Sequence, residues 1–432
     1  MISTASPPPG LNSPGLNRGW YIASGERAAA ATAAGTYFLL LCGYYMLRSL
    51  REAMALEAGR ENIPLLFSLT FVVMLAILPA YWWVVARVRR DRLFAAVYLP
   101  IVLLFIVVAL LTRNGHVPAV LAGAYFVLVT TMNLFLVTVF WSVMVDLWRP
   151  GPAQRVFGIM SADGSAGALV GPAFNAAFVA RIGFTAVIYI ACTLLVLAVL
   201  TGTAAQKLRA RAPDAGVNTR VAVGGRAVDD LKRLARSPYL LVIAGFIVVG
   251  QLLGAFMYNE QARYVEATYT QLSDRAALFA RIDLASSVFA LVMQTFVVGW
   301  LTARGGVRAT LTAMWTLGAV SFLALVLVPS GAMLLITQVI RRGGDYGLFK
   351  PAREMLFTVL GPESRFKSKS LLDTLLQRGA DSLGNGLYLL VAPLGLAGIA
   401  ALSASACVLL TLGARWLGAA FAEQESKGLR SR

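Results

Sequence analysis

The sequence predicts an all-α polytopic membrane protein whose twelve transmembrane helices form two bundles of six. Hydrophobic residues make up 58% of the chain and charged residues only 14%, whereas a soluble protein carries about 25% charged residues. Twelve apolar stretches recur along the chain, each close to the ~20 residues that a helix needs to cross a bilayer core. A long charged connection after the sixth stretch divides the chain into two halves.

The expected elements follow these stretches in order. The first half is expected to hold six helices, at 29–51, 64–86, 93–112, 118–145, 157–180 and 184–204. The second half is expected to hold six more, at 239–259, 282–302, 310–328, 333–360, 371–391 and 396–417. The expected domains are a disordered cytoplasmic tail (1–28), an N-terminal bundle (29–204), a cytoplasmic linker (205–238), a C-terminal bundle (239–420) and a cytoplasmic tail (421–432). The polar stretch 261–281 is expected to lie outside the membrane.

The net charge of +17 follows the pattern of an oriented membrane protein rather than that of a nucleic-acid-binding protein. Basic residues concentrate in alternate connections, at 87–92, 149–155, 207–236, 304–308, 365–369 and 427–432. Connections rich in Lys and Arg stay in the cytoplasm, and an even number of spans returns the chain to the same side. We therefore expect both termini in the cytoplasm and a lipid bilayer around the protein.

The two halves share a short repeated pattern. GPAQR, which ends at Arg155, and GPESR, which ends at Arg365, lie 210 residues apart, and each follows the fourth helix of its half. An aspartate comes eight residues later in both halves, Asp163 in the first and Asp373 in the second. These matches favour a parallel duplication, and transporters built from internal repeats bind substrate near the midplane between them.

Charged residues interrupt the tenth and eleventh expected helices. A rise of ~1.5 Å per residue places Arg341, Arg342 and Asp345 ~12–18 Å from one face, and Arg378 and Asp381 ~11–15 Å from the other. The spacings i,i+4 and i,i+3 allow pairs of Arg341 with Asp345 and of Arg378 with Asp381. Ionisable residues inside a membrane are costly and usually functional. We expect these five residues to bind an anion that displaces aspartate from arginine; a structural salt-bridge network is the alternative.

A second charge pattern occurs twice, with two basic residues and one acidic residue at i, i+3 and i+4 on one helical face. Its members are Arg48, Arg51 and Glu52 in the first expected helix, and Lys350, Arg353 and Glu354 in the tenth. We expect ion pairs that open and close during transport, or, alternatively, basic side chains that snorkel to the interface. Asp146, at the end of the fourth helix, and Asp373, early in the eleventh, join this group; for Asp146 a helix cap is the alternative.

The residues that metal, redox and covalent chemistry require are sparse. The chain has one histidine, His116, and three cysteines, Cys42, Cys192 and Cys407, in three separate apolar stretches. These spacings fit neither a disulfide framework nor a metal site. We therefore expect no metal, no bound cofactor and no enzymatic activity.

The segment that starts YGLFKPAREM at Tyr346 and continues through LLDTLLQRGADSLGNGL to Leu387 resembles the ATP/ADP antiporter family of plastids and intracellular bacteria. Members carry phrases similar to YSLFDPTKEM and AIDVVxxRxGKSGG. The matching residues are Tyr346, Leu348, Phe349, Pro351, Glu354, Met355, Asp373 and Arg378, with Arg353 in place of a lysine. The first helix is similar too, since YYMLRSLREAM resembles YSxLRxLKD, and Phe140 and Trp141 match an FW pair of the fourth helix. Lys350 and Asp381 invert the charge of the family residue at their positions.

The resemblance implies a major-facilitator-like fold and a divergent bacterial branch of these nucleotide transporters. We therefore expect a monomeric, secondary-active transporter of the bacterial inner membrane that works by alternating access. Its expected partner is a small anionic metabolite, with a nucleotide among the candidates, because guanidinium groups match phosphate and carboxylate. Two alternatives stay open. One is a proton-coupled symporter or drug exporter with Asp345 or Asp381 as proton carrier, and the other is a non-transporting membrane sensor or scaffold.

Overall fold

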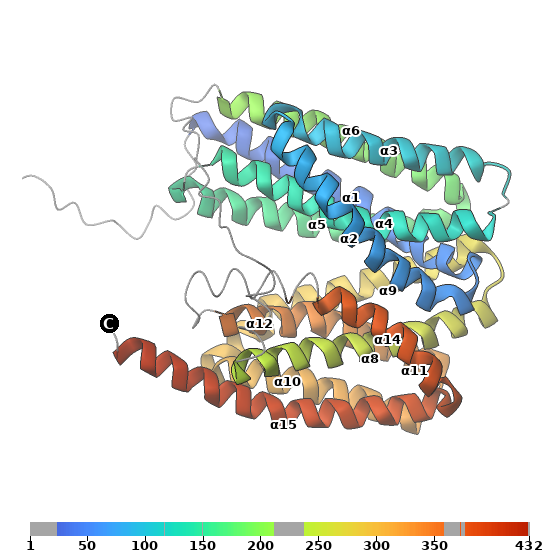
Figure 1. Cartoon of the computed structure of the whole chain (residues 1–432), viewed down its shortest axis with the longest axis vertical. Helices are drawn as coiled ribbons and strands as arrows, with labels where there is room; N and C mark the ends of the chain where they lie inside the picture. Colours follow the sequence, from blue (N-terminus) through green and yellow to red (C-terminus); the bar gives the residue numbers. More distant parts are fainter. Residues whose placement is uncertain are drawn as a thin grey trace, which may run out of the picture.

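The computed structural model describes residues 24–115, 117–148, 150–210, 237–357, 372 and 376–430, and within these ranges the regular elements are all helices. They form two elongated lobes that lie side by side (Figure 1). The first lobe contains α1 (Ser24–Glu57), α2 (Ile63–Arg87), α3 (Leu93–Leu111), α4 (Ala119–Leu147), α5 (Pro150–Ile182) and α6 (Phe184–Ala210). Two short turns, η1 (Arg60–Asn62) and η2 (Arg90–Arg92), precede α2 and α3.

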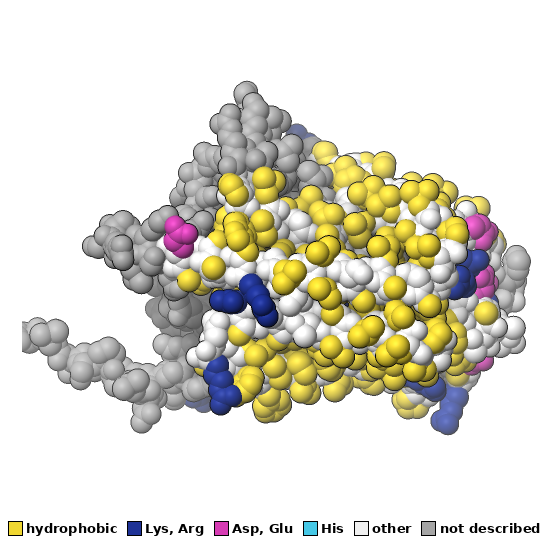
Figure 2. Space-filling model, turned by 90° about the horizontal axis from the view of Figure 1, so that it is seen from below, with side chains coloured by type: hydrophobic (Ala, Val, Ile, Leu, Met, Phe, Trp, Pro, Cys, Tyr) yellow, Lys and Arg dark blue, Asp and Glu magenta, His cyan; other side chains and the backbone are white. Residues whose placement is uncertain are grey.

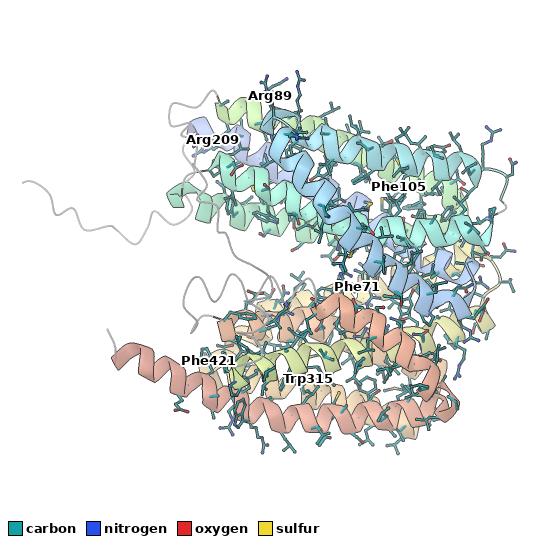
Figure 3. All side chains as sticks on the ribbon, in the orientation of Figure 1. Phe71, Arg89, Phe105, Arg209, Trp315 and Phe421 are labelled. Carbon is teal, nitrogen blue, oxygen red and sulfur yellow. The ribbon has the colours of Figure 1, made fainter. Side chains whose placement is uncertain are left out.

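The second lobe contains α8 (Pro238–Thr268), α9 (Leu272–Val292), η3 (Met293–Val298), α10 (Gly299–Leu327), α11 (Gly331–Gly344), η4 (Asp345–Phe349), α12 (Lys350–Leu356), α14 (Gln377–Val391), η7 (Ala392–Leu394) and α15 (Gly395–Arg430). Both ends of the described chain lie at one end of the molecule, which we call the terminal end (left in Figure 1). The opposite end, with the α1–α2 and α8–α9 connections, is the distal end. The labelled side chains Arg89, Arg209 and Phe421 lie toward the terminal end (Figure 3).

The described helices make twelve passes along the long axis of the lobes. Nine continuous helical stretches of the described chain are long and apolar enough to cross a membrane. One continuous stretch, Leu272–Leu327, has 56 residues and would measure ~84 Å, far more than a bilayer core of ~30 Å. It turns back at Gly306, whose φ of 64° lies in the left-handed region that glycine tolerates. The stretch Gln377–Glu423 turns in the same way at Gly395, where φ is 66°.

Because each of these two stretches contains two passes, the nine stretches make eleven passes. The helix that runs through α11, η4 and α12 is the twelfth pass of the described chain. Its arginines and aspartates lower its hydropathy, as the sequence predicts for this helix. The predicted fold class, with twelve helices in two bundles of six, is confirmed.

The polar stretch 261–281, expected to lie outside the membrane, is almost entirely helical. α8 continues to Thr268 and α9 begins at Leu272, so only three residues separate the two helices. Charged residues in this stretch are tolerated in helices because they pair with partners: Glu266 with Arg60, and Arg275 with Glu57. The polar stretch therefore extends two packed helices toward the distal end.

Close packing of small residues holds the first lobe together. α1 packs against α4, α5 and α6. On α5, a Cβ at Gly171 would lie 2.6 Å from the carbonyl oxygen of Cys42 on α1. Small residues let helix backbones approach in this way, and α5 carries them in the stretch GSAGALVGP. The lobes meet where α9 packs against α1 and α5, and where α14 packs against α2.

Candidate functional site

A polar pocket of about 200 Å³ lies between the two lobes. We call it the central pocket. α1 and α2 supply its wall from the first lobe, and α8, α11, η4 and α14 supply the wall from the second lobe. Its charged lining residues are Arg48, Arg51, Glu52, Arg341, Arg342, Asp345, Arg378 and Asp381. These are the five residues predicted to bind substrate and the three gating residues predicted in the first helix.

Two of the predicted ion pairs were specific, and the structure contains one of them. Arg378 Nη1 lies 3.8 Å from Asp381 Oδ2, and Gln251 Nε2 donates to Asp381 Oδ1 at 2.5 Å. The predicted pair of Arg341 with Asp345 does not form. The backbone between the two residues is an ordinary α-helical turn, since the N–H of Asp345 bonds the carbonyl oxygen of Arg341. The pair is absent because the guanidinium group of Arg341 bonds another side chain.

Arg341 instead points toward α8. Its Nε donates to Gln338 Oε1 at 3.0 Å, and Gln338 Nε2 donates to Gln261 Oε1 at 2.7 Å. Gly254 on α8 makes room for the guanidinium group, since a Cβ there would lie 3.0 Å from Arg341 Nη1. Among the residues that the structure describes, no carboxylate lies within 4.0 Å of Arg341. Its charge thus faces the pocket without a direct acidic partner.

The site contains a buried carboxylate that sequence reasoning missed. Asp283 on α9, with a side chain only 1% exposed, forms an ion pair with Arg342 of its own lobe. Its Oδ1 also lies 4.0 Å from Nη2 of Arg48, on α1 of the other lobe. Its Oδ2 has no hydrogen-bond partner among the described residues. The expected helix starts at Ile282, whereas α9 starts at Leu272. In the structure Ala276, Ala280 and Asp283 are buried together at i, i+4 and i+7, the period of one helical face.

Asp283 also lines a second pocket of about 160 Å³, which we call the side pocket. Ser286, Ser287 and Gln294 contribute polar groups to it, and α5 contributes Ser165. The two pockets share three lining residues, Arg48, Arg342 and Tyr346. These three residues therefore form the partition between an arginine-rich compartment and a compartment of hydroxyl and amide groups.

The π segment η4 places Tyr346 in this partition. A second π segment, η3, packs against it, and Gln294 Nε2 of η3 donates to the carbonyl oxygen of Tyr346 at 2.8 Å. Gly347 allows the close approach, because a Cβ there would lie 2.8 Å from the Met293 side chain. π-helical turns occur mostly at functional sites.

On the distal side of the central pocket, two ion pairs join the two lobes. Arg60 Nε bonds Glu266 Oε2 at 2.7 Å, and Arg275 Nη1 bonds Glu57 Oε1 at 2.8 Å. We call these two ion pairs the distal clamp. Closer to the pocket, Tyr258 donates its hydroxyl proton to Glu52 Oε2 at 2.6 Å, and Glu52 also pairs with Arg51. Glu52 thus lines the central pocket and also contacts the second lobe through Tyr258.

The remaining predicted gating residues lie outside the pocket lining. In α12, the Nζ of Lys350 lies 5.0 Å from the centroid of the Tyr346 ring, and Arg353 is buried with its Cζ 5.9 Å from that of Phe349. Glu354 is half-buried in the same helix, and Asp146 is half-buried in the last turn of α4. Asp373 lies outside the described residues. The two predicted trios therefore do not share one pocket.

No protein-family model matches the sequence, and no curated protein matches it. Solved structures do match over almost the whole chain. A peptide transporter, POT, in complex with alafosfalin is 15% identical with a TM-score of 0.66, and the match covers 94% of this chain and 97% of that one. The nucleoside transporter NupG is 13% identical with a TM-score of 0.59, and the match covers 92% and 99%.

A bacterial homologue of the human lysosomal transporter Spinster, in an inward-facing and unoccupied conformation, is 15% identical with a TM-score of 0.55. That match covers 91% of this chain and 98% of the homologue. At identities this low, the similarity shows only that the fold is shared. The resemblance to the ATP/ADP antiporter family stays a prediction. The chain has the two-lobed, twelve-helix fold of major-facilitator-type transporters.

Proposed function

We propose that this protein is a secondary-active membrane transporter that carries a small anionic organic solute by alternating access. The observation that carries the proposal is the central pocket, which brings five arginines and three carboxylates from two lobes around one space. Ionisable side chains in the interior of a membrane protein are expensive to bury, and replacing buried ion pairs by well-packed apolar residues is often neutral or stabilising. Binding of a charged solute by these side chains would explain why the protein keeps them in its interior.

The charge balance of the site favours an anion. Arg48, Arg51, Arg341, Arg342 and Arg378 contribute five positive charges. Glu52, Asp283, Asp345 and Asp381 contribute four negative charges, which leaves one formal positive charge. Of these five arginines, Arg341 is the one that has no carboxylate within 4.0 Å among the described residues. A carboxylate or phosphate on the substrate would complete the balance through the two-pronged contact that a guanidinium group makes.

The distal clamp supports alternating access. Its ion pairs connect the lobes at the distal end, so the conformation shown is closed there. Opening the distal side requires these pairs to separate, and a partly exposed pair contributes only ~0.2–1 kcal/mol. The clamp is therefore weak enough to be reversed by the binding energy of a solute. With both termini in the cytoplasm of a bacterial inner membrane, the open side would be the cytoplasmic one.

Proton-coupled symport is a second candidate, and one observation favours it. Asp345 lines the central pocket, yet it has no ion-pair partner within 4.0 Å among the residues that the structure describes. A carboxylate without a fixed partner can exchange a proton. The two candidates differ in what drives uptake, since an exchanger needs solute on the far side, whereas a symporter needs a proton gradient.

A thermal-shift screen of the purified protein against nucleotides, phosphorylated metabolites and dicarboxylates tests the binding claim. A ligand at 100 times its Kd stabilises the folded state by about 2.7 kcal/mol, so a binding anion should raise the melting temperature by several degrees. The same anion should give a much smaller shift for Arg341→Ala. An exposed arginine at the distal end, Arg113, provides the control variant Arg113→Ala. A panel without any shift, or equal shifts for the wild type and Arg341→Ala, contradicts the proposal.

A further inference from the structure

A groove of about 800 Å³ runs along the outside of the second lobe, away from both pockets of the candidate site. α10 forms most of it, and Arg415 of α15 completes it. This face of the lobe is largely apolar: Figure 2 shows yellow and white side chains across its middle and dark blue side chains toward its two ends. In a membrane protein such a face lies against lipid.

The lining residues change from charged to apolar along α10. One row of residues four apart runs through Arg308, Thr312, Thr316 and Val320, and a parallel row runs through Gly305, Ala309, Ala313 and Leu317. The first row passes from charge through hydroxyl groups to hydrocarbon, and the second row supplies a floor of small side chains. From Arg308 to Val320 the helix rises ~18 Å, about half of a bilayer core of ~30 Å. The groove therefore has the depth of one leaflet.

Within the part of the chain that the structure describes, the charged end of the groove has no acidic partner. Arg308 and Arg415 are both exposed, and no carboxylate of the described chain lies within 4.0 Å of either of them. The position of Arg308 is fixed by packing, because a Cβ at Gly418 on α15 would lie 2.8 Å from the Cα of Arg308. Gly418 lies one helical turn beyond Arg415. The two guanidinium groups are thus held on neighbouring helices at one end of the groove.

Exposed tryptophans mark the level of this end in the membrane. Trp300 is 53% exposed and Trp416 is 49% exposed, and the Arg304 guanidinium lies 4.3 Å from the ring centroid of Trp300. Tryptophan is enriched at the boundary between headgroups and hydrocarbon. Arg308 and Arg415 therefore lie at the depth where lipid phosphates are found, with the rest of the groove below them.

We infer that this groove is a binding site for an anionic phospholipid. The phosphodiester lies between Arg308 and Arg415, which match it in charge and in hydrogen-bond geometry. The exposed Thr316 hydroxyl faces the ester region, and an acyl chain covers Leu317 and Val320. Basic residues near a membrane surface add about 1 kcal/mol each to the binding of anionic lipid, so two of them give a preference of roughly 30-fold over zwitterionic lipid.

Native mass spectrometry of the full chain in detergent measures this lipid preference directly, with phosphatidylglycerol and phosphatidylcholine as competing probes. The wild type should retain phosphatidylglycerol with a preference of roughly 30-fold over phosphatidylcholine. Arg308→Gln combined with Arg415→Gln should lose that preference, and Arg308→Lys combined with Arg415→Lys should keep most of it. Ala313→Trp, which fills the groove without changing charge, should lower the binding of both lipids. Soluble glycerol phosphate at the same concentration should not bind, because the acyl chain supplies much of the affinity.

The matched control is Arg113→Gln combined with Arg181→Gln, which removes two exposed arginines from the distal end. It should bind phosphatidylglycerol as the wild type does. Equal binding of the two lipids by the wild type overturns the inference. So does an equal loss of binding in the groove variant and in this control, because the effect would then follow from net charge. The result does not depend on transport, since no lipid here is a substrate.

Discussion

Asp283 on α9 lies between two arginines of different lobes: it forms an ion pair with Arg342 of its own lobe, and its Oδ1 is 4.0 Å from Nη2 of Arg48 on α1. Its carboxylate is therefore shared across the boundary that must open and close in alternating access. Because both pockets touch Arg48 and Arg342, an anion in either pocket competes with Asp283 for the same guanidinium groups. This competition gives a physical route from binding to a change in the lobe contact.

Replacing Asp283 by Asn should destabilise the protein strongly. The change leaves Arg48 and Arg342 buried without their shared carboxylate, and breaking one partner of a buried pair costs about 3–5 kcal/mol. We expect a drop of several degrees in the melting temperature of the detergent-purified protein. Asp274→Asn is the control, since Asp274 is exposed in the first turn of the same helix. Melting curves that coincide for Asp283→Asn and the wild type would show that Asp283 is not a buried partner.

Removing the distal clamp should shift the protein toward a conformation that is open at the distal end. Glu57→Gln combined with Glu266→Gln breaks both ion pairs while keeping side-chain size. Two partly exposed pairs contribute about 0.4–2 kcal/mol together, so the distally open population should rise roughly 2- to 30-fold. Spin labels at Glu61 and Thr270, one on each lobe, report this opening as a longer distance by double electron–electron resonance.

The labels can be placed selectively, because the three native cysteines are buried. Asp274→Asn, which touches neither ion pair, is the control for loss of negative charge at this end. If the distance distribution of the double variant matches that of the wild type, the clamp does not set the conformation.

Gly254→Ala should weaken anion binding without unfolding the protein. The added methyl group would lie 3.0 Å from Arg341 Nη1, so the guanidinium group must move by a few tenths of an ångström out of its place in the pocket. The backbone need not move, because the contact is with the far end of a flexible side chain. We expect a several-fold loss of affinity for the anion found by the thermal-shift screen, measured by ligand titration.

Gly245→Ala on the same helix is the matched control, since no atom lies within 4 Å of its added Cβ. Alanine is favoured over glycine in a helix by about 1 kcal/mol, so this control should bind normally and melt at the same temperature or slightly higher. Equal affinities of the two glycine variants would mean that the position of Arg341 does not matter for binding.

The charges of the tenth and eleventh expected helices could be predicted to lie at a similar level, because the rise per residue gives the position of each residue along its helix. Arg341 and Asp345 from one helix, and Arg378 and Asp381 from the next, lie around one pocket. The absence of a pair between Arg341 and Asp345 could not be predicted, because Arg341 bonds Gln338 instead. Gln338 is held in turn by Gln261 on α8, 77 residues away in sequence.

Asp283 was missed for a related reason. Glu266 and Arg275 make the stretch around the α8–α9 connection look solvated, but their partners Arg60 and Glu57 belong to the other lobe. Contacts between lobes leave no periodic signal in a sequence. The membrane spans themselves do leave one, since each must supply a run of apolar residues long enough to cross the bilayer. The fold class was therefore predictable, and the position of one key carboxylate was not.

Solute counterflow in proteoliposomes tests the central claim most directly. Vesicles that contain the purified protein are loaded with an unlabelled anion from the screen, and uptake of the labelled anion is followed without any ion gradient. The wild type should accumulate label transiently, Arg341→Lys should do so more slowly because a single ammonium group replaces the guanidinium fork, and Arg341→Ala should do so least. Equal counterflow by the wild type and Arg341→Ala, or none by the wild type for an anion that it binds, would contradict an arginine-centred anion exchanger.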